Sequence, residues 1–579
     1  MILLFGGTTE GRIAATTLEE AGQPFYYSTK TGGQTVALHH GEPLQGAMDA
    51  QAMAAFCRGH EIRLLIDAAH PFATLLHQTV AEVAGTLHIP AIRFERIYAE
   101  HDPSLVWCDD FADVVRRFDC HSLLATTGVQ TIAKLQPLAQ RGVKVWYRIL
   151  PRESSILLAR KQGIADSQLC FYHEGEDEAE VLRHMRPEAV LMKESGRSGG
   201  FEQKVAAAHS LGIKVYVVKR PEMPAIFHTV NGPHGLRRMV ERLLPDFYPL
   251  RSGLTTGTCA TAAAVAQTGR LLRGEQPAEV PVILPDGETI HVAVGYGDGY
   301  AYVIKDGGDD PDVTHGIEVR AAVRPTGVFA VKGGDGVGRI TLPGFDMPPG
   351  EAAINRVPRE MMRRNIADEV EITISVPQGR EVARRTFNPR LGIEDGISII
   401  GMSGIVKPFS EEAFVDSIRK CMQVAKASGT DRVVINSGAK SERAVRTLYP
   451  QLPQQAFVEY GNYIGETLKM ADQLSIPNVT LGVMMGKAVK LAAGQLDTHS
   501  KKGVMDKAFI ARMLHEADCH VDITHMTLAR ELWTLIPPEK LKDFCRTLIR
   551  HCHRHCDPLL PNGTLTILLI DDNGLVFSV

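Results

Sequence analysis

The stretch "ILLFGGTTEGR", residues 2–12, decides how the first half of the chain folds. Apolar residues are followed at once by two glycines and then by a segment with helical character, which is the pattern of a buried strand that turns tightly into a helix. The glycines are Gly6, Gly7 and Gly11, so the spacing departs from G-x-G-x-x-G and only weakly indicates phosphate binding at a helix start. A tight turn without a ligand has the same pattern.

Similar apolar runs recur from this stretch to about residue 245, with helical segments between them. Most are bounded by Gly or Pro, as strands buried on both faces of a parallel sheet are. We therefore expect an α/β fold whose first part is a two-lobed, Rossmann-like parallel-sheet region, with the lobes dividing near residue 120 around a cleft. The runs include "LLIDAAHP" (64–71), "LLATTG" (123–128), "VKVWYRIL" (143–150), "AVLMKESG" (189–196) and "KVYVVKRP" (214–221).

A change of pattern near residue 249 predicts a domain boundary. Pro245 and Pro249 break the preceding helix, and a glycine- and threonine-rich segment follows. The predicted domains are residues 1–248 and 249–579, each long enough to bury a core. The second is expected to be a mixed α/β region that ends in a hairpin at Asn573–Gly574.

Composition excludes several classes of protein. Hydrophobic residues make up 44% of the chain and charged residues 22%, as in globular proteins, and a net charge of −4 lacks the positive excess of a nucleic-acid binder. Ten scattered cysteines favour reduced thiols in a cytoplasm. No apolar run approaches about 18 residues, so we expect neither a membrane span nor a signal peptide. The oligomeric state, including a homo-oligomer, stays open.

The segment "VIKDGGDDPDVTHG", residues 303–316, concentrates four aspartates in a glycine-broken turn. An EF-hand calcium loop is excluded, because Pro311 and Ile317 occupy the positions that need Gly and Glu. Two interpretations remain: an aspartate-capped solvated turn, or a ligand loop whose carboxylates accept hydrogen bonds from hydroxyl or amino groups. Similar turns nearby predict one binding surface built from loops. They are "GLTTGTCA" (253–260), "KGGDGVGR" (332–339), "NPRLGI" (388–393) and "GMSGIVKP" (401–408).

Together with "TFNPRLGIEDGISIIGMSGIVKPFS" (386–410), "INSGAKSERAV" (435–445) and "YGNYIG" (460–465), these motifs resemble the cobalt-precorrin-5B C1-methyltransferase family of anaerobic cobalamin biosynthesis. The resemblance covers nearly all of residues 250–579. It implies methylation of a corrin-ring carbon by S-adenosylmethionine. No protein-bound metal is implied, since the sulfonium already makes the methyl group electrophilic and the cobalt belongs to the substrate. The enzyme's task is to align donor and ring carbon.

The resemblance suggests roles for individual residues, each with a structural turn or a surface ion pair as the alternative. Asp306, Asp309 and Asp310 are candidates for the donor's polar groups, and Ser437, Gly438 and Glu442 form a second candidate donor loop. Candidates for substrate carboxylates are Thr255, Thr256 and Thr258 at a helix start, together with Arg390 and Lys407. Cys259 is expected to be a packed thiol.

The first half resembles precorrin-6A reductase, also known in its cobalt form, a nicotinamide-dependent family of the same pathway. The motifs that carry this are "DAAHPFA" (67–73), "IPAIRFER" (89–96) and "KESGRSGG" (193–200). The implied reaction is hydride transfer from NADPH or NADH, between which the residues do not choose. Cofactor candidates are Gly6, Gly7, Thr8, Thr9 and Gly11; catalytic candidates are His70, Lys193 and Ser195; substrate candidates are Arg148 and Arg197. His70 is expected to titrate near neutrality.

Together the resemblances predict a bifunctional enzyme that methylates cobalt-precorrin-5B and then reduces cobalt-precorrin-6A to cobalt-precorrin-6B. Its partner is a small tetrapyrrole, with no nucleic acid and no membrane. The alternatives are a two-domain oxidoreductase of another pathway and a non-catalytic tetrapyrrole or cobalt carrier. Fusion of consecutive steps raises the local concentration of the second site.

The run "HCHRHC", residues 551–556, looks like a metal site, but helical spacing puts Cys545, Cys552 and Cys556 on one buried face. His551 and His555 lie four apart on another face. We therefore expect no metal centre there, only a histidine pair of weak affinity.

Overall fold

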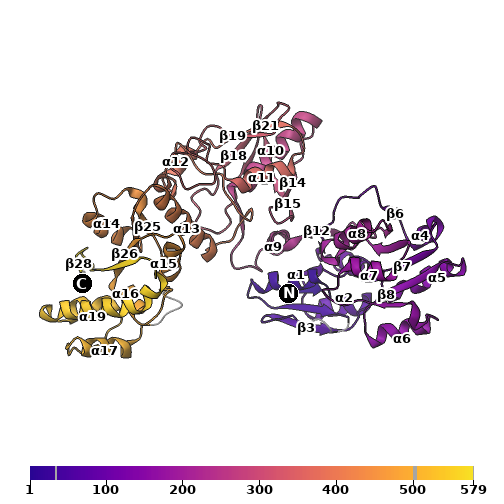
Figure 1. Cartoon of the computed structure of the whole chain (residues 1–579), viewed down its shortest axis with the longest axis horizontal. Coiled ribbons are helices and arrows are strands. Elements are labelled where there is room, and N and C mark those ends of the chain that lie inside the picture. The colour runs from indigo at the N-terminus through magenta and orange to yellow at the C-terminus, as the bar shows by residue number, and fades with distance from the viewer. Residues whose placement is uncertain (31, 33–35, 500–504, 578–579) are drawn as a thin grey trace. The chain divides into compact units, whose positions relative to one another are not determined.

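The computed structural model describes residues 1–30, 32, 36–499 and 505–577. The chain forms two compact units, and Figure 1 traces it from indigo at the N-terminus to yellow at the C-terminus. By contacts, the first unit contains residues 1–251 together with 286–290, and the second contains 252–285 and 291–579. Within the described residues, every helix is either too short or too polar to span a bilayer.

The first unit contains two six-stranded sheets in which every neighbouring pair of strands is parallel. One sheet has the order β12-β5-β4-β1-β2-β3 and the other β6-β11-β10-β7-β8-β9. The order of strands reverses between β1 and β4 in the first sheet, and between β7 and β10 in the second. This is the doubly wound Rossmann arrangement, which confirms the predicted fold class.

The opening strand shows why its residues form a central strand. Ile2 and Leu4 pack into one core cluster and Leu3 and Phe5 into another, so both faces are buried. The elements of this lobe are β1 (Ile2–Phe5), β2 (Phe25–Thr29), β3 (Gly41–Gln45), β4 (Leu64–Asp67), β5 (Ala91–Glu95) and β12 (Phe227–Asn231), with α1 (Thr9–Glu19), α2 (Ala50–Gly59), α3 (Thr74–Leu87) and α9 (Gly232–Leu243).

The division between the lobes differs from the expected position near residue 120. The chain enters the second sheet already at β6 and returns to the first at β12, so residues near 120 lie inside the second lobe, between α4 and β7. The elements of this lobe are β6 (Val106–Cys108), β7 (Ser122–Ala125), β8 (Lys144–Ile149), β9 (Leu169–Phe171), β10 (Ala189–Lys193) and β11 (Lys214–Val218), with α4 (Phe111–Arg117), α5 (Ile132–Gln140), α6 (Glu153–Lys161), α7 (Glu178–Met185) and α8 (Phe201–Ser210).

The second unit begins with a helix of small residues, α10 (Thr256–Arg273), whose first nine residues are all buried. Small side chains let this helix lie close to a mixed five-stranded sheet of order β16-β17-β18-β21-β19. The strands are β16 (Gly295–Tyr296), β17 (Ala301–Ile304), β18 (Glu318–Pro325), β19 (Ala330–Gly333) and β21 (Val370–Ser375); two short pairs are β13 (Gly253–Leu254) with β23 (Ile405–Val406), and β14 (Glu279–Ile283) with β15 (Thr289–Ala293).

The C-terminal part of this unit is a sheet of order β25-β24-β26-β27-β28, parallel except for the last strand. Its strand order reverses between β24 and β26. The predicted hairpin at Asn573–Gly574 is confirmed, since β27 and β28 pair antiparallel around it. The elements are β24 (Arg432–Asn436), β25 (Phe457–Glu459), β26 (Asn478–Met484), β27 (Thr564–Ile570) and β28 (Val576–Phe577), with α13 (Glu411–Ala427), α14 (Ala439–Leu448), α15 (Ile464–Gln473), α16 (Met485–Ala492), α17 (Lys507–Glu516) and α19 (Pro538–Cys556).

The helix α19 lies alongside α16 (Figure 1) and carries the "HCHRHC" run. Cys545, Cys552 and Cys556 are buried in the core beneath it, as the helical spacing predicted. The His551 ring bonds Glu516 of α17, with 2.6 Å between Nε2 and Oε2, while His555 is exposed. The thiols therefore contribute to the packing of the core.

Candidate functional site

The glycine turn after β1 lies where the strand order of the first sheet reverses. A Cβ on Gly6 would come within 2.3 Å of the Tyr27 hydroxyl, and one on Gly11 within 2.6 Å of the Gly6 Cα, so both glycines are required by packing. Gly7 has a φ of +92°, and a Cβ there would meet nothing within 4 Å. The Gly7 N–H donates to the Tyr27 hydroxyl at 3.3 Å, and the space that a Gly7 side chain would fill is clear, at the place where doubly wound sheets bind their ligands.

Thr8, proposed from the sequence as a cofactor ligand, has a structural task instead. Its hydroxyl accepts a hydrogen bond from the Gly11 N–H at 3.0 Å, which caps α1, and donates one to the Ala68 carbonyl at 2.6 Å. The side chain thus fastens the turn to the end of β4. Thr9 is half-buried and its Oγ1 accepts a hydrogen bond from Arg12 at 3.3 Å.

The structure brings His70 and Lys193 together from the two lobes of the first unit. His70 follows β4 in one lobe and Lys193 ends β10 in the other, and Phe72 lies between them. The Phe72 N–H donates to His70 Nδ1 at 3.2 Å, and the Lys193 ammonium lies 5.0 Å from the centre of the Phe72 ring. Two residues more than a hundred positions apart therefore border the same space.

The electrostatics of this pair differ from expectation. Burial, reinforced by the positive charges of Arg96 and Lys193, lowers the pKa of His70 to about 3, below the neutral range that the sequence predicted. The Nδ1 atom accepts a hydrogen bond, which leaves the proton of the neutral ring on Nε2. Burial lowers the pKa of Lys193 to about 8, which makes the lysine the group that titrates near neutral pH.

A bridge between the lobes went unpredicted. Glu10, on the first turn of α1 and 5% exposed, forms an ion pair with Arg96 at 3.1 Å and accepts a hydrogen bond from the Ser198 hydroxyl. Arg96 also donates to the Ser195 carbonyl at 2.6 Å. Ser195 is thus held through its backbone, and its hydroxyl donates a long 3.4 Å hydrogen bond to the Gly199 carbonyl. The one sequence signal was an acidic residue directly after the glycine turn.

Arg148 was proposed to bind substrate, and the structure contradicts this. Its side chain is buried and its guanidinium bonds Glu176 at 2.8 Å and also Glu178. A carboxylate of the substrate would have to displace one of these acids. Arg197 is different: it is exposed, and its guanidinium forms no hydrogen bond or ion pair with the described residues.

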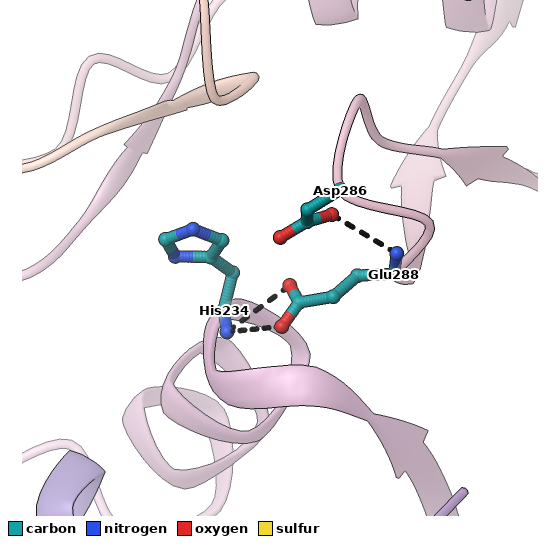
Figure 2. A group of neighbouring side chains, drawn as sticks. All are labelled: His234, Asp286 and Glu288. Atoms are coloured by element: carbon teal, nitrogen blue, oxygen red, sulfur yellow. Dashed lines mark hydrogen bonds between the residues drawn. The ribbon is translucent and has the colours of Figure 1, made fainter. Parts of the chain in front are cut away.

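One further group of ligand-type side chains lies in the first unit: His234, Asp286 and Glu288, whose ligand atoms are within 4.8 Å of one another. Figure 2 shows that the Glu288 carboxylate accepts two hydrogen bonds from the backbone N–H of His234, at 2.9 and 3.1 Å. Asp286 accepts one from the Glu288 N–H at 3.0 Å. Burial raises the pKa of Glu288 to about 8. This arrangement caps the first turn of α9, which explains the burial of an acid.

In the second unit, three of the glycine-rich turns meet around the start of α10. The Leu254 N–H donates to the Asp306 carbonyl at 2.7 Å, and the Thr255 N–H donates to the Gly404 carbonyl at 3.1 Å. The acidic loop is attached to the third turn by a 2.9 Å bond from the Phe409 N–H to Asp310 Oδ1. The turns 332–339 and 388–393 are joined to each other through residues 396–397.

The aspartates of the acidic loop differ in their partners and in their exposure. Asp312 forms an ion pair at 2.5 Å with Lys305, which is 1% exposed, so this carboxylate neutralises a buried ammonium. Asp306 Oδ1 accepts the Gly308 N–H at 2.9 Å, as in an aspartate-capped turn. Asp309 is exposed. Both interpretations of this loop therefore describe part of it.

Thr256 and Thr258 are corrections to the predicted substrate site. Thr256 Oγ1 accepts the Ile400 N–H at 2.9 Å and lies 3.1 Å from the Ser398 carbonyl, while Thr258 Oγ1 donates to the Gly404 carbonyl at 2.6 Å. Both side chains are buried. They fasten the 398–404 loop to the helix and have no free hydroxyl for a substrate. Thr255, half-buried, caps α10 by accepting the Thr258 N–H at 3.2 Å.

The turn after β24 contains Ser437 and Gly438, at the reversal point of the C-terminal sheet. The Ser437 N–H donates to Ser441 Oγ at 3.0 Å, and the Gly438 N–H donates to Asn436 Oδ1 at 3.0 Å. Gly438 has a φ of +135° and begins α14. These hydrogen bonds hold the turn in place, and Ser437 and Gly438 remain candidates for the donor site.

Glu442 and Arg390, predicted separately as a donor ligand and a substrate ligand, are bonded to each other. Glu442, 6% exposed, accepts hydrogen bonds from Arg390 at 2.8 Å and from Arg446 at 2.9 Å. Its carboxylate is thus occupied by two guanidinium groups and is not available to a donor. Lys407 is exposed.

A cavity adjoins this turn, lined among others by Arg390, Cys421, Phe457 and Glu459. Glu459 ends β25 and stands 21 positions after Gly438. Sequence reasoning missed it, although an acid at the end of the strand that follows a glycine turn, about 20 residues on, is a signal of nucleotide-binding folds.

The fold is α/β, and each unit contains a parallel or mainly parallel sheet whose strand order reverses beside a glycine-containing turn. Residues 1–235 match the family model described as precorrin-6x reductase CbiJ/CobK, and residues 245–408 match the model CbiD. The chain is 40% identical over 345 residues to a cobalt-precorrin-5B C(1)-methyltransferase of Prosthecochloris aestuarii, which spans 55% of this chain and 94% of the relative. A relative of the same name from a Geobacillus species is 41% identical over 324 residues, 52% of this chain and 88% of its own.

Among solved structures, the chain is similar to the crystal structure of cobalamin biosynthesis protein CbiD from Archaeoglobus fulgidus, at 31% identity and a TM-score of 0.26, over 44% of this chain and 83% of that one. It is also similar to CobK precorrin-6A reductase, at 19% identity and a TM-score of 0.35, over 43% and 98%. The chain belongs to the cobalt-precorrin-5B C(1)-methyltransferase family and carries a region of the precorrin-6x reductase family before it. It is a methyltransferase and a reductase of cobalamin biosynthesis in one polypeptide, which confirms both predicted resemblances.

Proposed function

We propose that the second unit methylates C1 of cobalt-precorrin-5B with S-adenosylmethionine, and that the first unit reduces the product, cobalt-precorrin-6A, to cobalt-precorrin-6B with NADPH or NADH. The observation that carries this is that one chain spans 94% of a C1-methyltransferase and also matches a precorrin-6x reductase model. The substrate is a small tetrapyrrole, and cobalt enters with it. The cytoplasm is the location that the ten free thiols favour.

In the first unit, the reduced nicotinamide supplies a hydride. The turn from Gly6 to Gly11 fits such a cofactor, because the space beside the Gly7 Cα is clear and the turn lies at the reversal of strand order. Lys193, with its pKa lowered to about 8, supplies the proton for the second carbon of the reduced double bond. The Nε2–H of His70 donates a hydrogen bond to a ring substituent, and Arg197 pairs with a substrate carboxylate.

In the second unit, S-adenosylmethionine supplies a methyl group that is already electrophilic. The turn at Ser437 and Gly438 is the favoured donor site, because it lies where β24 and β26 diverge. The residues of the protein hold donor and ring carbon in line, which contributes several kcal/mol by positioning alone. Lys407 then faces carboxylates at the substrate's rim, and the acidic loop with Asp306, Asp309 and Asp310 is the second candidate site for the donor's polar groups.

Exposed apolar side chains support a flat substrate on the loop surface of this unit. Met402 is 73% exposed, Phe409 66% and Ile400 48%, and all three lie on the 400–409 segment that borders α10 and the acidic loop. Large apolar side chains gathered on a loop surface are typical of binding sites. A macrocycle with an apolar face and acidic side chains fits apolar side chains flanked by Lys407.

Mass spectrometry of the reaction mixture tests the proposal. Purified full-length chain is incubated with cobalt-precorrin-5B and S-adenosylmethionine, and then with NADPH or NADH. We expect the transfer of one methyl group in the first stage and the gain of two hydrogens in the second. A substrate that keeps its mass in the first stage would overturn the methyltransferase assignment, and one that gains no hydrogens in the second would overturn the reductase assignment.

A further inference from the structure

Glu459 is placed beside the candidate donor turn by the parallel pairing of β24 and β25. Asn436 pairs with Glu459 in the register of the two strands, so the residues after both strands leave the same edge of the sheet. A Cβ placed on Gly438 would lie 3.4 Å from Glu459 Oε1, which shows how closely the carboxylate approaches the turn.

The Glu459 carboxylate differs from the other acids near this edge. Glu442 is held by Arg390 and Arg446, whereas Glu459 forms no hydrogen bond or ion pair with any described residue. Lys487 acts on it only through its charge, since that ammonium donates its hydrogen bond to the Gly461 carbonyl. Glu459 thus offers two acceptor oxygens to a ligand.

The cavity next to Glu459 is small. Its volume is about 10 Å³, which is room for one water molecule, and two of its lining residues, Ile418 and Phe457, are buried. A ligand at this edge is therefore expected to meet the Glu459 carboxylate rather than to enter the cavity.

We propose that Glu459 binds the two ribose hydroxyls of S-adenosylmethionine. This inference rests on the proposed methyltransferase function and assigns the donor to the edge of the C-terminal sheet rather than to the acidic loop at 306–310. The order along the edge is consistent: the turn at Gly438 lies at the reversal point of the sheet, and the carboxylate lies at the end of the next strand. A carboxylate that bonds both hydroxyls makes charge-assisted hydrogen bonds, which are the strong ones.

Calorimetric titration of the full-length chain with S-adenosylhomocysteine tests the assignment. We expect Glu459→Gln to raise the Kd at least tenfold, because the amide keeps the size of the side chain but loses its charge and one acceptor. Glu459→Asp, which keeps the charge on a shorter side chain, is expected to fall between the wild type and Glu459→Gln. Glu466→Gln, at an exposed position of α15 that is paired with Lys469, is the matched control and should leave the Kd unchanged.

A second ligand separates loss of the diol contact from general damage. For an S-adenosylhomocysteine analogue that lacks both ribose hydroxyls, the wild type and Glu459→Gln should bind with equal Kd. An unchanged Kd for S-adenosylhomocysteine in Glu459→Gln, or an equal loss for both ligands, would overturn the assignment while the wild type still methylates. If the wild type neither binds S-adenosylhomocysteine nor methylates the substrate, both the proposed methyltransferase function and the assignment of Glu459 are wrong.

Discussion

The burial of Lys193 affects both its pKa and its suitability as a proton donor. The residue ends a buried strand, so its ammonium is held where water is scarce, and its pKa falls to about 8. An ordinary lysine would remain protonated far above neutral pH and would release its proton slowly. The same burial that disfavours the charged form therefore suits the side chain to donate a proton.

Replacing this lysine should impair only the reductase. We expect Lys193→Met to lower the kcat of cobalt-precorrin-6A reduction by about 100-fold or more, a common effect of losing a general acid. In the wild type, kcat should fall as the pH rises through about 8, because Lys193 loses its proton there. Stopped-flow oxidation of the nicotinamide measures both effects. Lys214→Met, on an exposed ion pair of the same lobe, is the control; a full rate in Lys193→Met would remove the lysine from the mechanism.

The same substitution should stabilise the protein at neutral pH. The pKa of Lys193 is lower in the folded state than its ordinary value of 10.5, so folding disfavours the charged form. That penalty is fully present below pH 8 and disappears as the pH rises from about 8 to above 10.5. Differential scanning calorimetry should therefore give a higher Tm for Lys193→Met at pH 7 and a smaller difference at pH 10. A lower Tm at pH 7 would contradict the burial argument.

At the scale of elements, ion pairs hold the loops of the second unit to its sheet. Glu442 on α14 joins Arg390, on the short helical turn at 388–391, to Arg446 one turn along α14. In the same way, Thr256 and Thr258 join α10 to the 398–404 loop. These contacts explain why polar residues in family motifs need not touch a ligand: they position the loops that do.

Removing Glu442 should therefore cost stability rather than donor affinity. We expect Glu442→Ala to lower the free energy of unfolding by about 2 kcal/mol, because two partly buried guanidinium groups lose their partner. The Kd of S-adenosylhomocysteine should stay within twofold of the wild type. Urea unfolding and calorimetric titration measure the two quantities. Glu466→Ala should change stability by less than about 0.5 kcal/mol. A tenfold weaker affinity in Glu442→Ala would restore this residue to the donor site.

At the scale of the whole molecule, the chain combines two ligand-binding architectures in separate compact units. Each has its own reversal of strand order, and the residues proposed for hydride transfer and for methyl transfer lie in different units. The reactions should therefore be separable by single substitutions, even though linkage keeps the second site at a high local concentration.

A chain with Lys193→Met should convert cobalt-precorrin-5B to the methylated, unreduced ring and stop there, even with nicotinamide present. Wild-type chain added afterwards should carry the accumulated product to the reduced form. Mass spectrometry of timed samples follows both stages. If no methylated product accumulates, methylation depends on a working reductase, and the two units are not catalytically independent.

The sequence alone was enough to predict the alternation of strands and helices, the parallel sheets and the two families. These depend on local signals: apolar runs such as "ILLF" need burial on two faces, and glycines such as Gly6 and Gly11 fit where no Cβ has room. Family motifs extend over many consecutive residues, so they too can be recognised from the sequence alone. The meeting of the turns around α10 followed from their number and spacing.

Only the tertiary structure decided which polar side chains remain free for a ligand. Arg390 and Glu442 are 52 positions apart, and Thr256 and Ile400 are 144 apart, yet each pair is bonded. Glu459, in contrast, ends a strand beside the Gly438 turn and forms no hydrogen bond or ion pair with the part of the chain that the structure describes. Hydrogen bonds and ion pairs form between polar groups that the fold brings within about 3 Å, regardless of their distance in the sequence. A sequence motif therefore identifies candidate ligand-binding residues, and the tertiary structure determines which of them already have a partner in the protein.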